Sequence, residues 1–136
     1  MGCDIHAIVE ACEVSESAPT PDWAYSDWTR FDDLGRYYDI FGFLAGVRRD
    51  FPHIPPRGLP SDLSVAYREV DDDTFGDHSK SWLTTDEFAE ALACFDALRG
   101  ASGHSWKPTD FHAVLDYMRA LERTGRVVRF VFGFDN

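Results

Sequence analysis

The chain has 136 residues, of which 44% are hydrophobic, 15% aromatic and 27% charged, and its formal net charge is −11. This length fits one globular domain, residues 1–136. No apolar run reaches the roughly 20 residues that cross a bilayer, and no secretory leader pattern opens the chain. We therefore expect a cytoplasmic protein with no membrane partner. The acidic balance argues against a nucleic-acid partner, because such binding depends on neutralising phosphates.

The first segment alternates between apolar and polar residues, which predicts a strand over residues 2–12. Its polar set places Asp4 and His6 side by side on one face. After a turn-rich connection at residues 15–22, a second strand is expected from Trp23 to Thr29, forming a hairpin with the first.

The period changes after Arg36, where apolar residues recur at helical spacing and predict a helix that ends near Arg48. The residues of this helical face are Tyr37, Ile40, Phe41, Leu44 and Val47. Residues 50–62 contain four prolines and predict a stiff loop of the kind that often displays binding groups. A short helix over residues 61–70 and an acidic turn at residues 71–77 are expected to follow.

A capping box, Thr84 with Glu87 three residues later, predicts the start of a long helix. A second long helix is expected from about Pro108 to Arg123, followed by a strand over residues 126–134. The expected inward residues of the two helices are Phe88, Ala91, Leu92, Phe95 and Leu98 in the first and Phe111, Leu115, Met118 and Leu121 in the second.

These elements predict an α+β fold with a small, mainly antiparallel sheet packed against two or three helices. The sheet is expected to contain the N-terminal hairpin and the C-terminal strand. If the last strand runs antiparallel to the first, Asp135 and Asn136 end close to Asp4.

The cysteines and arginines limit the chemistry further. Three cysteines without a CxxC spacing predict reduced thiols rather than a disulfide framework or a structural zinc site. Six arginines lie between positions 30 and 68, and since a guanidinium group binds phosphate or carboxylate with two parallel hydrogen bonds, Arg36, Arg48 and Arg57 are candidates for anion binding. The alternative is that these arginines pair with the many aspartates of the chain.

Several separated blocks, MGCDIH, RYYDIFGFLAGVR, RGLPSDLS, DHSKSWLT and VRFVFGFDN, together resemble an uncharacterised family of small bacteriophage proteins. The resemblance spans essentially the whole chain. It implies a phage origin, a bacterial host cell and a single compact domain, but no mechanism. Its motif positions here are Cys3, Asp4, His6, Arg36, Tyr38, Arg48, Arg57, Asp62, Asp77, His78, Ser81, Trp82, Asp135 and Asn136.

This set is richer in Arg, His, Asp and hydroxyl groups than a core needs, which predicts one shared polar pocket. The expected ligand-binding residues are Asp4, His6, Arg36, Tyr38, Arg48, Arg57, Asp62, His78, Ser81, Trp82 and Asn136. Asp77 beside His78 suits acid–base chemistry, and the following helix N-terminus favours anions. The alternative is that Ser81 and Thr84 are a turn and a cap, with His78 exposed.

A divalent metal is a candidate cofactor, although none is assigned. Asp4, His6 and His78, with Asp62 or Asp77, offer the mixed nitrogen and oxygen ligands of zinc, manganese or iron. The Asp-x-His pair resembles the first ligand pair of metallophosphoesterases, but their later Asn-His and Gly-His-x-His elements are missing. No catalytic residue is assigned.

Three functions remain open at the level of sequence. The first is capture of a small nucleotide-like anion, as phage proteins that sequester host immune signals do. The second is a metal-dependent phosphodiesterase or nucleotide hydrolase that uses the same pocket. The third is an acidic protein that blocks a host protein. A homo-oligomer is compatible with the sequence.

Overall fold

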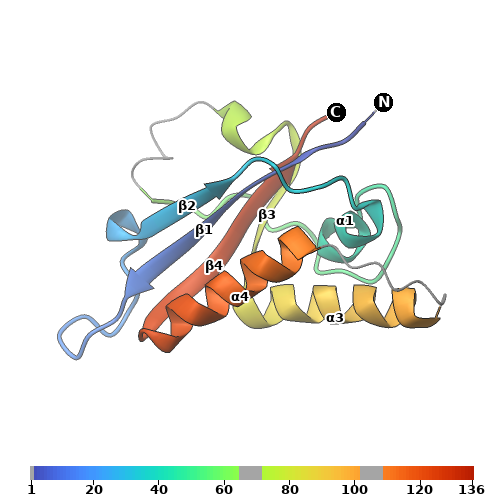
Figure 1. The fold of residues 1–136 in the computed structure, drawn as a ribbon. Helices are drawn as coiled ribbons and strands as arrows, with labels where there is room; N and C mark the ends of the chain where they lie inside the picture. The colour runs from blue at the N-terminus through green and yellow to red at the C-terminus, as the bar shows by residue number, and fades with distance from the viewer. Residues whose placement is uncertain (1, 65–71, 102–108) are drawn as a thin grey trace.

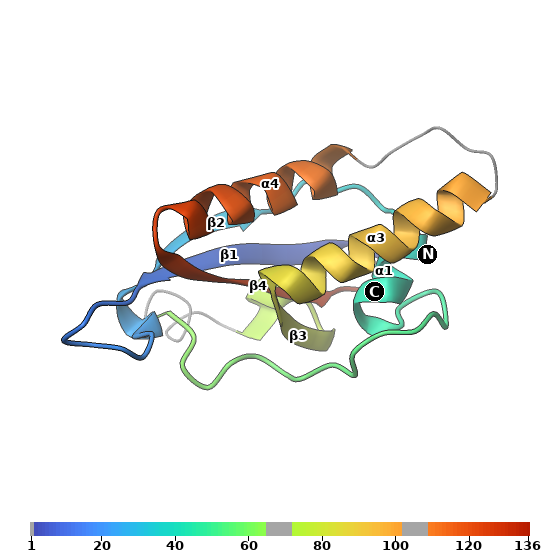
Figure 2. The same ribbon diagram turned by 90° about the horizontal axis from the view of Figure 1, so that it is seen from below.

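The computed structural model describes residues 2–64, 72–101 and 109–136. It contains a four-stranded antiparallel sheet in the order β2-β1-β4-β3, with α3 and α4 packed against one face (Figures 1 and 2). This confirms the α+β fold class. Along the chain the elements are β1 (Ile5–Glu13), the 3-10 helix η1 (Trp23–Tyr25), β2 (Asp27–Phe31), α1 (Tyr38–Ala45), the 3-10 helix η2 (Asp72–Phe75), β3 (His78–Thr84), α3 (Thr85–Ala101), α4 (Thr109–Arg123) and β4 (Arg126–Phe134).

The first and last strands form the centre of the sheet. They pair antiparallel from Ile5 opposite Phe134 to Glu13 opposite Arg126, so the two ends of the chain lie close together at one end of the sheet (Figure 1). This confirms both strands and the expected proximity of Asp135 to the N-terminal segment.

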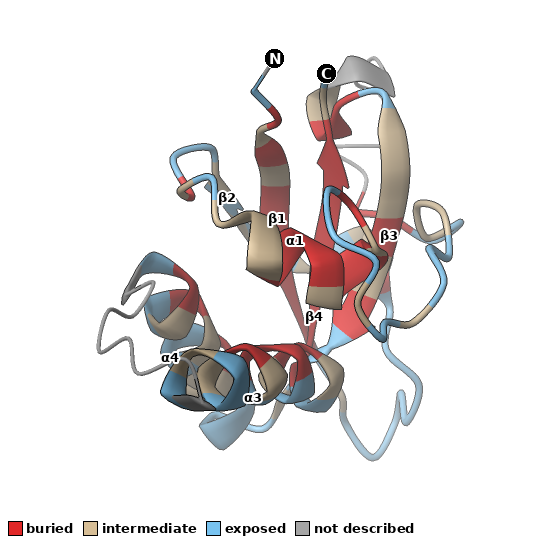
Figure 3. Cartoon of the chain, turned by 90° about the vertical axis from the view of Figure 1, so that its right-hand side faces the viewer, coloured by how far each residue is buried: buried red, intermediate tan, exposed pale blue. Residues whose placement is uncertain are grey.

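The main core lies between the sheet and the helices. Alternate residues of β1 and β4 point to this side, as the period of two requires, and the buried residues of α3 lie on its side towards the sheet (Figure 3). Leu98 does not belong to this core, because α3 extends beyond the sheet after Phe95 and leaves Leu98 38% exposed. Leu115 and Leu121 are only partly buried.

The opposite face of the sheet is covered by loops rather than helices. Ile8 and Val131 pack there against Leu63 and Phe75, which come from the proline-rich loop and from η2. This cover explains why β1 is buried on both faces for most of its length. The prediction of an irregular loop over residues 50–62 is confirmed.

The second strand begins later than the sequence predicts, and the first helix ends earlier. Trp23 starts η1 rather than a strand, because the carboxylate of Asp22 accepts a hydrogen bond from the backbone N–H of Ala24, and β2 follows η1. Helix α1 ends at Gly46, which adopts a left-handed conformation with φ 70°, so Val47 lies beyond the helix although it is buried.

Strand β3 was missed by the sequence reading, although the helix after it was found. The polar run at its start carries a bulge in the pairing with β4, and Ser79 has φ 54°. The capping box is confirmed, since Thr84 and Glu87 each donate a backbone N–H to the other's side chain.

Parts of the expected second half fall outside the described residues. A short helix was expected over residues 61–70, of which only 61–64 are described; residues 61–62 form a turn and residues 63–64 have no regular structure. Pro108, the expected start of the second long helix, also lies outside the described residues. Among the helices that are described, none combines the length and apolar character needed to cross a membrane.

Candidate functional site

The structure does not bring the eleven expected ligand-binding residues together: one group lies where both ends of the chain meet, a second lies at β3, and His78 and Asp62 lie apart from both. We call the first group, at one end of the sheet, the terminal cluster. Contacts join Asp4, His6, Arg36, Tyr38 and Arg48 there to the motif residues Cys3 and Asp135, and Asn136 follows Asp135 in the chain.

A histidine–aspartate pair forms the first part of the terminal cluster. The side-chain Nε2 of His6 lies 2.6 Å from Oδ2 of Asp135, whose other oxygen accepts a hydrogen bond from the backbone N–H of Asp4 at 3.1 Å. These bonds to His6 and Asp4 hold the pKa of Asp135 below its ordinary value. The carboxylate therefore orients the imidazole, an arrangement that suits proton transfer or hydrogen bonding to a ligand.

An arginine–aspartate pair forms the second part. Arg36 donates from Nε and Nη2 to the two oxygens of Asp4, at 2.6 and 3.1 Å, and this hydrogen bonding lowers the pKa of the Asp4 carboxyl. The two side chains are 54% and 43% exposed. A Cβ at Gly2 would overlap the Arg36 guanidinium, so the glycine permits this close approach.

Tyr38, the first residue of α1, and Arg48, in the segment that follows this helix, complete the terminal cluster. The Tyr38 hydroxyl accepts a hydrogen bond from the backbone N–H of Cys3 at 3.2 Å, and the Arg48 guanidinium carbon lies 5.2 Å from the centre of the Tyr38 ring. Burial raises the pKa of the Cys3 thiol, and the nearby Arg48 partly opposes this effect. Cys3 is fully buried, so it is not an accessible nucleophile.

His78 lies at the same end of the sheet but on a different face from His6. Its ring stacks on Phe134, a member of the helix-side core, whereas His6 lies between two inward residues of β1 and therefore faces the other way. In the described part of the chain, no three His, Cys, Asp or Glu side chains are placed to hold a metal ion. Asp4, His6 and His78 are therefore not placed together as metal ligands in this structure.

The second group lies at β3 and the loop that covers it. Arg57 forms a two-pronged ion pair with Glu87, and its guanidinium carbon lies 4.4 Å from the centre of the Trp82 ring. Its backbone N–H donates to the buried Ser81 hydroxyl at 3.0 Å. The hydrogen bonds from the Arg57 guanidinium, together with those from Thr84, lower the pKa of Glu87 to about 2. Arg57 is thus paired with an acid of the chain, as the alternative reading of the arginines anticipated.

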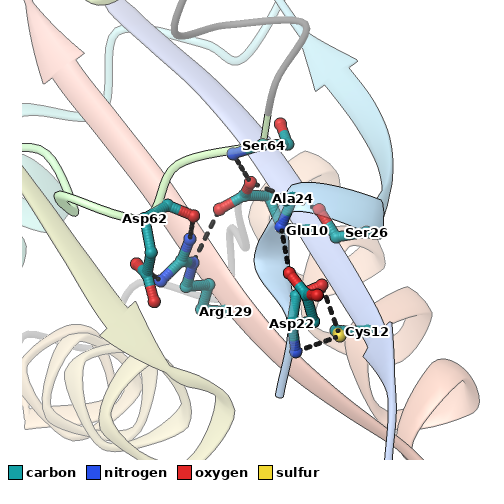
Figure 4. A network of polar contacts seen from close by, with 8 residues as sticks. All are labelled: Glu10, Cys12, Asp22, Ala24, Ser26, Asp62, Ser64 and Arg129. Carbon is teal, nitrogen blue, oxygen red and sulfur yellow. Dashed lines mark hydrogen bonds and ion pairs between the residues drawn. The ribbon is translucent and has the colours of Figure 1, made fainter.

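Asp62 belongs to a buried network that sequence reasoning missed (Figure 4). Arg129 donates to Glu10 at 2.6 Å and to Asp62 at 2.9 Å, and its guanidinium carbon lies 3.8 Å from the Trp23 ring centre. Glu10 also accepts the backbone N–H of Ser64 at 2.8 Å. Glu10 and Arg129 stand opposite each other in the β1–β4 register, so the pairing of the strands was the signal that could have found them.

A hollow of about 330 Å³ lies beside this network, between Trp23, Trp82, Asp62 and Arg129. It lies apart from the terminal cluster, because Arg129 is in the first half of β4 and Asp135 directly follows the end of that strand. The single pocket expected for all eleven residues is therefore not formed, and only the terminal cluster brings most of them together.

The terminal cluster combines opposite charges with an aromatic ring. Two guanidinium groups balance two carboxylates there, in a chain with a net charge of −11. A tyrosine ring and a histidine add one aromatic face and one titratable nitrogen. Such a set can bind a polar, negatively charged molecule.

Comparison with known proteins adds no relative: no family model, curated protein or solved structure matches this chain. The resemblance to a phage protein family accordingly stays a prediction from the sequence blocks.

Proposed function

We propose that this chain binds a small nucleotide-like anion at the terminal cluster. The observation that carries the proposal is the meeting of residues 3–6, 36–48 and 135–136 at one half-exposed end of the sheet. These three stretches contribute guanidinium groups, an aromatic ring and the His6–Asp135 pair. A phosphate group would bind the guanidinium groups, and a base or sugar would contact the ring and the carboxylates.

Part of this chemistry is already engaged within the protein. Arg36 is held by Asp4, so a phosphate would have to share or displace that carboxylate. Both side chains of the pair are about half exposed, and exposed ion pairs contribute only about 0–1 kcal/mol to stability. Replacing the Asp4 carboxylate by a phosphate therefore costs little free energy. In the phage setting that the resemblance implies, capture of a host nucleotide signal is the role that we propose.

The proposal is tested by native mass spectrometry of the full chain purified from phage-infected cells, followed by heating. We expect a retained mass that is released unchanged and contains phosphate. The purified chain is then titrated with the identified nucleotide. Arg48→Met is expected to weaken binding about 10- to 100-fold, because one charge-assisted contact contributes about 1.5–3 kcal/mol.

Arg119 provides the matched control. It lies on α4 and pairs with Asp86, away from the terminal cluster, so Arg119→Met removes the same charge without touching the site. Equal loss of binding in Arg48→Met and Arg119→Met, or no retained molecule together with no binding of cyclic dinucleotides and nucleoside phosphates, would contradict the proposal.

One observation favours a second function, hydrolysis of the same class of ligand. An imidazole held by a carboxylate at 2.6 Å is the pairing that general acid–base catalysis uses. A new product after incubation with the nucleotide would identify an enzyme, whereas unchanged ligand identifies capture. If the chain is an enzyme, His6→Gln is expected to abolish product formation while nucleotide is still bound.

A further inference from the structure

A groove of about 540 Å³ lies between β2, an edge strand of the sheet, and helix α4. It shares no residue with the terminal cluster. Its volume falls within the roughly 300–1,000 Å³ of small-molecule sites. The residues that matter for its chemistry are Phe31, Leu34, Val114 and Tyr117 on the walls and Asp33 and Asp110 at the rim.

The position of α4 explains why the groove exists. This helix packs mainly on β4, a central strand, so the inner side of the edge strand β2 is only partly covered. Tyr117 spans the gap: its ring meets Phe31 edge-on with centroids 6.2 Å apart, and its hydroxyl lies 2.8 Å from that of Thr29. An aromatic and aliphatic lining therefore remains open to a ligand.

The charge of the groove is negative. Arg30 is compensated by Asp32 at 2.8 Å, and the exposed carboxylates of Asp33 and Asp110 add two further negative charges. An apolar lining with carboxylates at one rim complements a molecule with a flat apolar body and a protonated amine. The carboxylates at the rim repel an anion, so we expect the groove and the terminal cluster to bind ligands of opposite charge.

We propose that this groove binds a small organic cation that carries an aromatic ring. The ring lies against Phe31 and Tyr117, the partly exposed aromatic side chains of the lining, where it buries apolar surface, and the ammonium group lies at Asp33 and Asp110. This inference is independent of the function proposed for the terminal cluster.

The test is a titration of the isotope-labelled full chain with tryptamine, followed by two-dimensional amide NMR. Indole-3-acetate serves as the ligand with the same ring and the opposite charge, and indole as the neutral one. We expect saturable shifts for groove residues with tryptamine at about 1 mM or below, and binding of indole-3-acetate at least about fivefold weaker.

Variants at exposed positions separate the contribution of the rim carboxylates from that of the apolar lining. Asp33→Asn with Asp110→Asn is expected to weaken tryptamine binding about five- to tenfold and to leave indole binding unchanged. Glu16→Gln with Asp116→Asn changes the net charge equally outside the groove and is expected to have no effect. Ala113→Phe, which fills the groove, is expected to abolish binding while the far-ultraviolet circular dichroism spectrum stays the same.

Three results would overturn the proposal. One is equal binding of tryptamine and indole-3-acetate, since the rim would then have no role. Another is a set of ligand shifts outside the groove. The third is a shift of groove resonances with chain concentration alone, which would identify a second copy as the occupant.

Discussion

Replacing Arg129 with methionine is expected to lower the free energy of unfolding by about 4 kcal/mol. The reason is the environment of Glu10, which is fully buried and accepts a hydrogen bond from Arg129 at 2.6 Å. Without the guanidinium group, the partners that the carboxylate keeps among the described residues are the N–H of Ser64 and the weaker contact from Ser26. Removal of one partner from a buried ion pair typically costs about 3–5 kcal/mol, because the remaining charge is left uncompensated.

The double variant Glu10→Gln with Arg129→Met separates this charge effect from lost packing. The glutamine keeps an acceptor for the Ser64 N–H but carries no charge, so the double variant is expected to lose only about 1–2 kcal/mol. Urea unfolding of each protein at pH 7 gives the free energies, and a domain of this size has about 5–15 kcal/mol to lose.

An exposed arginine serves as the control for this experiment. Arg119 pairs with Asp86, a side chain that is 88% exposed, and Arg119→Met is expected to cost at most about 0.5 kcal/mol. The reasoning is refuted if Arg129→Met costs no more than Arg119→Met. It is also refuted if the double variant is at least as unstable as Arg129→Met alone.

Three further outcomes are expected. The pKa of Glu87 falls from 4.5 to about 2 in the folded state, so its ionised form contributes up to about 3 kcal/mol to the free energy of unfolding above pH 4.5. This contribution is lost as the pH falls towards 2. The difference in free energy of unfolding between the protein and Glu87→Gln, measured by urea unfolding, should therefore narrow over that range. Cys94, the half-buried thiol, is expected to react with a thiol reagent first, and the two buried thiols should react only on unfolding; three equally fast thiols in a stopped-flow trace would contradict the burial. Gly133→Ala is expected to cost about 2–3 kcal/mol in thermal unfolding, since a Cβ there overlaps the carbonyl oxygen of Phe75, and an unchanged midpoint would disprove that contact.

The central strands and long helices were predictable from the sequence because their periods are regular. Apolar residues alternate in β1 and β4, and a capping box marks the start of α3. Strand β3 was not predictable in this way, because its first residues are polar and its bulge at Ser79 breaks the alternation.

The candidate site was predictable only where strand pairing determines it. The antiparallel arrangement of the first and last strands placed Asp135 beside Asp4 and His6, as the sequence suggested. The partner of Arg57 was not foreseeable, because Glu87 is 30 positions away and its capping role already explained its presence. Pairing across loops depends on how the loop crosses the sheet, which local patterns do not encode.

The burial of Glu10 was not predictable from the sequence for a related reason. A strand with one solvated face and a strand covered by a loop show the same alternation of residue types. Only the packing of Leu63 and Phe75 over Ile8 and Val131 distinguishes them, and those contacts join segments more than 50 positions apart.

The pairing of β1 with β4 also sets the order in which this molecule can assemble. The two strands at the middle of the sheet are far apart in the sequence, with Ile5 opposite Phe134, so β1 cannot pair with β4 until residues 126–134 have been synthesised. The β1–β2 hairpin can form early, but an isolated hairpin is marginally stable in water. Closing so long a loop is entropically costly, and such non-local topologies fold on the slower scale of milliseconds to seconds. The four-stranded sheet therefore cannot be completed until its C-terminal strand is available to pair between β1 and β3.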